Sequence, residues 1–431
     1  MESNNFRTKI EDQIRQCIDH TVILDRHFLE DEQLLRTEQL TVLETIFNAN
    51  VRDAEIREIS SHFASVFRGD HPMHLSLWGK TGTGKTLTAS YLLNLISQMC
   101  KEKSIPLRFV HLDLSTPRPC FRALNDLACL LNASRRYKKG ISLEELMLRI
   151  EEALSEYRGY LVLFVDEVDN VRRDRDTFLT FLVRRLPQQI PSKLILVFAS
   201  NKLSWSEQMD PRIKSFLKVN ELVFKPYNAF DLQKILHIRV EKALKPGVVD
   251  EGVIEKIAAL ASREHGDARK AVGLLVRSAY LAEKAGSTIT VDIVDQAEEE
   301  IEQDKYLLMI RTAPVQMQAA MAGFIRALRG SRNDHIDTGE AYDAYKNFCR
   351  QAGLRSLSGR AFGDLITELD MYSLLRARVH SSGRYGRTKH ILCELPEDII
   401  TKIYEAILIN FELGSPPEPI SYPKREVKDD G

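Results

Sequence analysis

The first half of the chain alternates short apolar runs with longer segments whose apolar residues recur at helical spacing. The runs are apolar at consecutive positions, which is typical of parallel strands that are buried on both faces and joined by crossover helices. The pattern therefore predicts an α/β domain with a parallel five-stranded sheet and flanking helices. The predicted strands are residues 74–78, 107–114, 160–165, 194–200 and 221–224.

Beyond Pro226 the apolar runs stop and helical spacing continues alone, for example at Ile254, Ile257 and Ala261. This spacing favours a small all-helical unit. Residues 304–314, which close on a proline, predict a connector to a further domain.

The remaining third of the chain predicts helices followed by two strands. Apolar residues share one helical face after the connector, and again near 339–352 and 358–369. Two strand-like runs, 373–380 and 389–394, then flank the sequence SSGRYGRT. Three helices followed by a hairpin predict a winged-helix domain. The last segment has four prolines and little apolar content, so we expect no fold there.

Composition narrows the class of protein. The 431 residues are 44% hydrophobic and 28% charged, as in a soluble globular protein. The formal net charge is −1, so a nucleic-acid surface must come from local clustering of Lys and Arg. No apolar run is long enough to span a bilayer and the chain begins without a secretory stretch, so we expect a cytoplasmic protein without a membrane partner. The six cysteines show no metal-ligand spacing.

A phosphate-binding motif follows the first predicted strand. Residues 79–86 fit G-x-x-x-x-G-K-[ST] and precede a predicted helix. In this motif backbone N–H groups face phosphate oxygens, the lysine approaches the β and γ phosphates, and the final hydroxyl binds Mg²⁺. We therefore expect ATP or ADP to bind Gly79, Lys80, Thr81, Gly82, Thr83, Gly84, Lys85 and Thr86.

Two carboxylates follow the third predicted strand. Because Asp166 and Glu167 stand at the carboxyl end of a buried strand, we expect both to face the phosphate loop of a neighbouring strand. Asp166 is the predicted Mg²⁺ ligand beside Thr86. Glu167 is predicted to orient and polarise the attacking water, so the expected reaction is hydrolysis of ATP to ADP and phosphate.

With Asn201 closing the strand LILVFASN, these motifs make the chain resemble the AAA+ branch of P-loop ATPases. More specific matches make residues 35 to about 410 similar to the archaeal origin-recognition and helicase-loading initiators. The resemblance implies an ATPase base, a helical lid and a winged helix on duplex DNA. The matching segments are LRTEQL (35–40), DPRIKS (210–215), PY (226–227) with IL (235–236) and Arg239, GDARKA (266–271) and GRYGRT (383–388).

The resemblance also implies roles around the γ phosphate. Asn201 would sense it from its strand, Arg269 would reach it from the lid, and Tyr227 would lie beside the nucleotide. Arg212 would enter the site of a neighbouring subunit as an arginine finger and neutralise transition-state charge. The alternative for Arg212 is a surface salt bridge on the helix that it opens.

Two basic segments are candidates for DNA contact. The family carries a DNA-touching insertion after the second strand, where this sequence matches it loosely; a solvated basic loop is the alternative. The predicted contacts there are Arg118, Arg122, Arg135 and Arg136. In the winged helix the predicted helix contacts are Ser358 and Arg360, and those of the hairpin are Arg384, Tyr385, Arg387 and Lys389. A protein-binding wing is the alternative for the hairpin.

The sequence thus predicts an ATP-dependent DNA replication initiator with slow, regulatory hydrolysis. Its expected partners are double-stranded origin DNA, a replicative helicase and further copies of itself on DNA, and it would be associated with the nucleoid. The alternative is an AAA+ scaffold of a plasmid or mobile element whose last domain binds protein. The predicted divisions are an N-terminal segment (1–34), the base (35–226), the lid (227–310), the winged helix (311–412) and a flexible tail (413–431).

Overall fold

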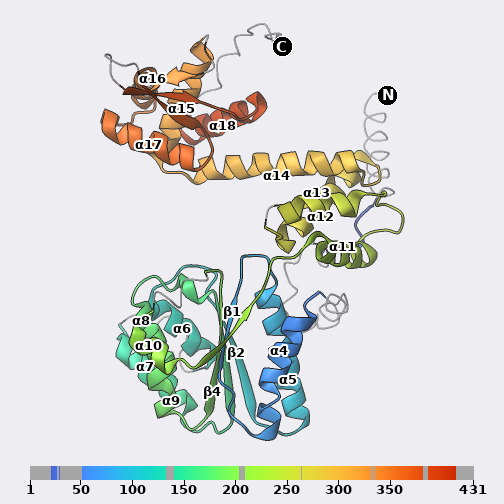
Figure 1. Cartoon of the computed structure of the whole chain (residues 1–431). Coiled ribbons are helices and arrows are strands. Elements are labelled where there is room, and N and C mark those ends of the chain that lie inside the picture. Colours follow the sequence, from blue (N-terminus) through green and yellow to red (C-terminus); the bar gives the residue numbers. More distant parts are fainter. Residues whose placement is uncertain are drawn as a thin grey trace, which may run out of the picture. The chain divides into compact units, whose positions relative to one another are not determined.

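The fold is that of a computed structural model, which divides into two compact units with the boundary between Ala297 and Glu298 (Figure 1). The described residues are 21–26, 29, 51–132, 140–202, 209–263, 265–331, 333, 335–381 and 387–413.

A parallel five-stranded sheet forms the core of the first unit, in the order β2-β3-β4-β1-β5. The predicted parallel sheet is confirmed, and each strand lies within a few residues of its predicted position. Every residue of β3 is buried, as consecutive apolar positions require. The strands are β1 (His74–Trp78), β2 (Leu107–Asp113), β3 (Tyr160–Asp166), β4 (Lys193–Ser200) and β5 (Val219–Val223).

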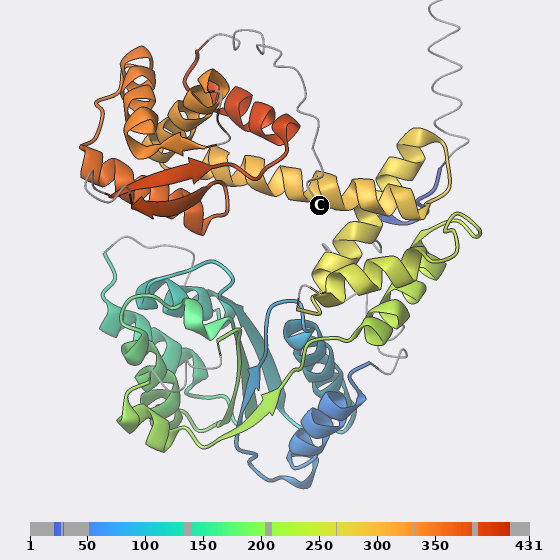
Figure 2. The same cartoon turned by 45° about the horizontal axis from the view of Figure 1, so that its top comes forward.

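Helices cover both faces of this sheet (Figures 1 and 2). One apolar core, which includes Phe63, Leu93 and Phe164, lies under α4 (Asp53–Phe63) and α5 (Lys85–Glu102). A second core lies on the opposite face. The elements there are α6 (Cys120–Leu130), α7 (Leu143–Leu154), α8 (Arg175–Thr180), α9 (Leu186–Gln189) and α10 (Pro211–Phe216), with a π-helical turn at Phe181–Arg185.

The all-helical segment predicted after Pro226 is present. Asn228 and Asp231 form a capping box that begins its first helix, and Asp267 caps the third by accepting from the N–H of Arg269. Residue 24 joins the same segment, because its N–H donates to the Ala243 carbonyl at 2.7 Å. The helices are α11 (Ala229–Ala243), α12 (Val253–Arg263), α13 (Ala268–Ala285) and α14 (Val291–Thr312).

The second unit has the predicted winged-helix order. Its sheet is antiparallel in the order β6-β8-β7, and its core includes Phe324, Tyr345 and Phe362. Two elements were not predicted: β6, which has only two residues, and α18, which buries Ile403 and Ile407. The elements are α15 (Val315–Gly330), β6 (Ile336–Asp337), α16 (Thr338–Gln351), α17 (Gly359–Met371), β7 (Arg376–Ser381), β8 (Arg387–Leu392) and α18 (Glu397–Asn410).

The segment 304–314, predicted as a connector, is helical for most of its length. Helix α14 continues through Thr312 and stops just before Pro314. The helix persists because Ile310 is fully buried and Leu307 packs against the core of the second unit, while no glycine or proline interrupts the segment. Within the described parts of the chain, no helix is both long and apolar enough to cross a membrane.

His74, at the start of β1, predicts a pH dependence of stability. Its Nδ1 accepts the N–H of Leu196 at 3.1 Å, which requires a neutral ring. Burial, together with the nearby charges of His71 and His62, lowers the pKa of His74 to about 4. Below pH 6.5 the unfolded chain therefore binds the proton that the folded chain refuses, so stability falls as the pH drops towards 4, by about 2 kcal/mol at pH 5.

Urea unfolding at pH 7 and pH 5 measures this contribution. The variant His74→Asn keeps an acceptor near the position of Nδ1 but does not titrate, so it is expected to lose less stability than the natural protein over the same interval. Equal losses in the two proteins would show that His74 is not the responsible group.

Candidate functional site

The carboxyl ends of neighbouring strands bring the predicted chemistry together. The register pairs Trp78, the last residue of β1, with Ser200, the last of β4. The phosphate loop and Asn201 therefore leave the sheet side by side. Strand β3, the other neighbour of β4, ends at Asp166. In an open parallel sheet, ligands bind at this edge.

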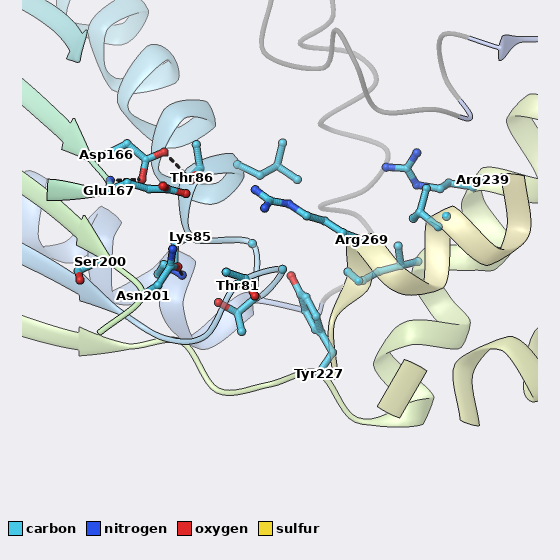
Figure 3. Close-up of a pocket in the computed structure, with 18 of the residues that line it drawn as sticks. Thr81, Lys85, Thr86, Asp166, Glu167, Ser200, Asn201, Tyr227, Arg239 and Arg269 are labelled. Atoms are coloured by element: carbon cyan, nitrogen blue, oxygen red, sulfur yellow. Dashed lines mark hydrogen bonds between the residues drawn. The ribbon is translucent and has the colours of Figure 1, made fainter. Parts of the chain in front are cut away.

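A cavity of about 600 Å³ lies over this edge (Figure 3). This volume is in the range of small-ligand and cofactor sites. The walls come from the phosphate loop, the ends of β3 and β4, and the lid helices. The lining residues are Thr81, Gly82, Thr83, Gly84, Lys85, Thr86, Leu87, Asp166, Glu167, Ser200, Asn201, Tyr227, Ile235, Arg239, Ala268, Arg269, Val272, Gly273 and Val276.

The ammonium group of Lys85 is buried at the floor of the cavity. It donates to the carbonyls of Gly79 at 2.7 Å and Lys80 at 2.8 Å, and to Oδ1 of Asn201 at 2.8 Å. Burial lowers the pKa of Lys85 to about 8, partly opposed by the carboxylate of Asp166. An anionic phosphate would further offset the cost of burying this charge.

Thr86 and Asp166 place two oxygen ligands together. The Thr86 hydroxyl donates to Oδ2 of Asp166 at 2.6 Å. Burial raises the pKa of Asp166, and the bond from Thr86 opposes that shift. These donors fit Mg²⁺, which is bound by few protein oxygens together with phosphates and water. The described residues hold no cluster of three or more His, Cys, Asp or Glu that could hold a metal ion.

Glu167 lies beside Asp166 in an uncommon backbone conformation. Its φ of 51° is in the left-handed region, which non-glycine residues enter mainly at functional sites. Oε2 accepts from the amide of Asn170 at 2.8 Å. Burial raises the pKa of Glu167, and the carboxylates of Asp166 and Asp169 add to this effect. A raised carboxylate pKa suits a group that must accept a proton from water.

The lid closes the opposite side of the cavity. Arg269 points from the start of α13 towards the phosphate loop, and Tyr227 stands over the loop (Figure 3). The loop is shaped to admit these groups: a Cβ built on Gly84 would lie 2.4 Å from the Tyr227 hydroxyl, and one on Gly82 would lie 1.7 Å from Oδ1 of Asp267. Only glycine fits at these two positions.

Arg212 does not line this cavity. It stands at the start of α10, where Asp210 caps the helix by accepting from its N–H at 2.8 Å. Its side chain is exposed and forms no ion pair with another described residue.

The first basic segment is only partly available. The guanidinium of Arg118 is paired with Asp126, while Arg122 is exposed on α6. The helix predicted to carry this segment is present as α6, and its buried residues Leu124 and Leu127 pack into the core. Arg135 and Arg136 lie outside the described residues.

Only some of the predicted DNA contacts of the winged helix lie among the described residues. Ser358 caps α17 by accepting from the N–H of Ala361 at 3.4 Å, and Arg360 in the first turn is exposed. Lys389 donates to the hydroxyl of Thr367 at 3.0 Å, which ties the hairpin to α17. Arg384 and Tyr385 lie outside the described residues, and only the backbone of Arg387, at the start of β8, is described.

Three site residues had no predicted role. Arg239 lines the cavity and donates to the Leu29 carbonyl at 3.0 Å. Asn170 holds the Glu167 carboxylate, and Arg52 contacts the phosphate loop. Helical spacing between Glu167 and Asn170 offered a weak signal, whereas Arg52 offered none because its partners are distant in the sequence.

Comparison with protein families and solved structures agrees with this architecture. Residues 68–204 match an AAA domain, 233–299 match the Cdc6 AAA+ ATPase-type lid domain, and 309–403 match the CDC6 C-terminal winged helix domain. The structure is similar to that of the Aeropyrum pernix ORC1 protein in complex with DNA, with a TM-score of 0.73 and 29% identity over 90% of this chain and 97% of that one.

Curated relatives share most of the chain. An ORC1-type DNA replication protein of Pyrococcus furiosus is 32% identical over 86% of this chain and 91% of its own length. ORC1-type DNA replication protein 1 of Sulfolobus acidocaldarius is 34% identical over 81% of this chain and 87% of its own. The chain belongs to the family of ORC1-type DNA replication proteins.

Proposed function

We propose that this protein is an ATP-dependent replication initiator that binds origin duplex DNA and supports loading of a replicative helicase. The observation that carries the proposal is a nucleotide cavity closed by base and lid in a chain that also holds a winged helix. The structural relative from Aeropyrum pernix, which was solved in complex with DNA, supports a DNA partner. A nucleotide cavity and a winged helix in one chain fit a protein whose affinity for DNA depends on the nucleotide it has bound.

In this proposal ATP lies across the phosphate loop. Lys85 exchanges its bonds to the loop carbonyls and Asn201 for bonds to phosphate oxygens. Thr86 and Asp166 hold Mg²⁺, which would neutralise phosphate charge. Tyr227 lies beside the nucleotide, and Arg269 meets the γ phosphate from the lid. Because base and lid both contact the bound phosphates, a change in the nucleotide can change the conformation of both.

Hydrolysis in this proposal begins with Glu167, which orients water and accepts its proton. Asn201 senses the γ phosphate from the end of β4. Arg212, exposed on α10, would complete the site of a neighbouring copy, because its own cavity does not contain it. Since turnover then requires an aligned neighbour, hydrolysis is slow in a single copy and the nucleotide state acts as a switch.

DNA binding in this proposal uses both units. The exposed start of α17, with Ser358 and Arg360, approaches the major groove, and the hairpin residues Arg384, Tyr385, Arg387 and Lys389 approach the minor groove. In the base, Arg122 together with Arg118, Arg135 and Arg136 would meet phosphates.

The dependence of DNA affinity on salt tests this assignment. If Arg384 and Arg387 each neutralise one phosphate, replacing both with alanine is expected to make the slope of log K against log salt about 2 units less steep. A double variant with Arg350→Ala and Lys402→Ala removes the same charge from exposed sites of α16 and α18 and serves as the matched control. The control is expected to change the slope by far less.

An unchanged slope and affinity in the Arg384 and Arg387 double variant would remove the hairpin from the DNA site. If the natural protein binds duplex DNA no more strongly than the general polyanion heparin, the scaffold alternative gains support, because its last domain would then bind protein. A nuclease-protection footprint on the host replicon, with and without ATP, tests whether an origin is the target.

A further inference from the structure

Arg52, just before α4, is a buried charge at the centre of the nucleotide domain. Its side chain is 7% exposed, although guanidinium groups are rarely buried without specific partners. It precedes the phosphate loop by a full helix and strand and does not line the cavity. A guanidinium buried to this extent needs partners that bond to its N–H groups and compensate its charge.

The guanidinium joins two backbone segments that are far apart in the sequence. One Nη2 hydrogen-bond partner is the carbonyl of Thr83 in the phosphate loop, at 2.9 Å, and the other is the carbonyl of Lys225, at 2.6 Å. Residues 224–228 link the end of β5 to the start of α11, and hence base to lid, and are called the hinge below. Arg52 therefore ties the phosphate loop to the hinge of the lid.

Aromatic and acidic groups complete the setting. The guanidinium carbon lies 4.0 Å from the ring centroid of Tyr227 and 5.4 Å from that of Phe224. Nη1 donates to Oε1 of Glu55 at 2.9 Å, which compensates the buried charge. The planar fork suits this arrangement, because it donates in its plane while its face stacks. A lysine ammonium offers neither geometry.

Tyr227 extends the connection to the lid. Its N–H donates to the carbonyl of Gly266 at 3.2 Å, and the hydroxyl stands over Gly84. Gly266 immediately precedes Asp267, whose carboxylate caps the helix that begins with Ala268 and Arg269. Contacts thus run from Arg52 through Tyr227 and Gly266 to the start of α13, which carries Arg269.

We infer that Arg52 is a positioning residue for nucleotide binding, which holds the phosphate loop and the hinge tyrosine in the arrangement that receives ATP and ADP. The inference rests on the nucleotide site of the proposed function and adds a residue to it. Because Arg52 bonds to the phosphate loop and stacks on Tyr227, which in the proposed function contact ATP and ADP alike, both nucleotides are expected to lose affinity by the same factor.

The test measures ATP and ADP affinity at low temperature by calorimetry. Arg52→Lys is expected to bind both nucleotides about 10-fold more weakly. The lysine cannot bond to both carbonyls as the guanidinium does, and the loss corresponds to about one charge-assisted hydrogen bond. Arg57→Lys changes an exposed arginine of the same helix and is expected to match the natural protein. A role in stability alone would lower the melting temperature of Arg52→Lys and leave its affinities unchanged, which would overturn the inference.

Chemical rescue adds a second readout. Guanidinium chloride at low millimolar concentration is expected to restore the nucleotide affinity of Arg52→Ala, since the ion can enter the space left by the side chain, whereas sodium chloride is not. It is not expected to restore Lys85→Ala. Absence of rescue in folded Arg52→Ala would contradict the inference, and if that variant does not fold, Arg52→Lys decides the matter.

These outcomes separate the inference from the proposed function. If the natural protein binds ATP and Arg52→Lys binds it equally well, only the inference fails. If the natural protein binds ATP but not duplex DNA, the initiator function fails while Arg52 keeps its role. If the natural protein binds no nucleotide, both fail.

Discussion

Replacing Lys85 with alanine is expected to weaken ATP binding at least about 100-fold, the largest loss of ATP affinity among the variants considered. A buried ammonium that bonds to phosphate contributes charge-assisted hydrogen bonds of about 1.5–3 kcal/mol each, and the change removes more than one. The cavity offers Arg269 as a further cation, but it approaches from the lid and does not replace a charge at the floor.

Calorimetric titration with ATP and Mg²⁺ measures the loss. Lys101→Ala, which removes an exposed lysine from the last turn of the same helix α5, is the matched control and is expected to bind as the natural protein does. A far-ultraviolet circular dichroism spectrum like that of the natural protein shows that Lys85→Ala is folded. Retention of full affinity in that folded variant would show that the loop does not hold the phosphates as proposed.

Glu167→Gln is expected to separate binding from turnover. Glutamine keeps the size of the side chain but cannot accept the proton of water, so the hydrolysis rate should fall by a factor of about 10²–10⁴. ATP affinity should stay within a few-fold, because Lys85 and Thr86 are untouched. Single-turnover hydrolysis and equilibrium binding measure the two quantities separately.

The pH profile of the natural protein supplies a further check on Glu167. Because its pKa is raised, the carboxylate is protonated over a wider acidic range than an ordinary glutamate, and hydrolysis should rise as the pH increases through that pKa. Glu156→Gln, an exposed change before β3, is the control and should hydrolyse ATP at the natural rate. Natural turnover in Glu167→Gln would assign the proton transfer to another group.

The sequence predicted the parts of the site that depend on local pattern. The phosphate loop is a contiguous motif, and Asp166 ends a strand that is recognisable from its apolar run, so both were identified with their roles. The five parallel strands were predicted for the same reason. Their order was not, because it is decided by pairing between segments that are distant in the sequence.

The parts that the sequence missed depend on distant or weak signals. Arg52 reaches carbonyls 31 and 173 positions away, and a carbonyl has no side-chain identity to recognise. Helix α14 was shortened in prediction because its acidic middle hides the apolar positions Leu307 and Ile310. The ion pair of Arg376 with Glu394, at 2.7 Å, likewise depends on the pairing of β7 with β8.

Gly82 shows how a second domain can constrain a motif. The general phosphate-loop pattern allows any residue at this position, but here the carboxylate of Asp267 occupies the space that a side chain would need, and the Gly82 carbonyl accepts the N–H of Ala268 at 3.2 Å. A side chain at position 82 would meet this carboxylate and would also bear the strain of a φ of +69°. The glycine of this loop is therefore demanded twice, by the backbone of the base and by the lid that closes on it.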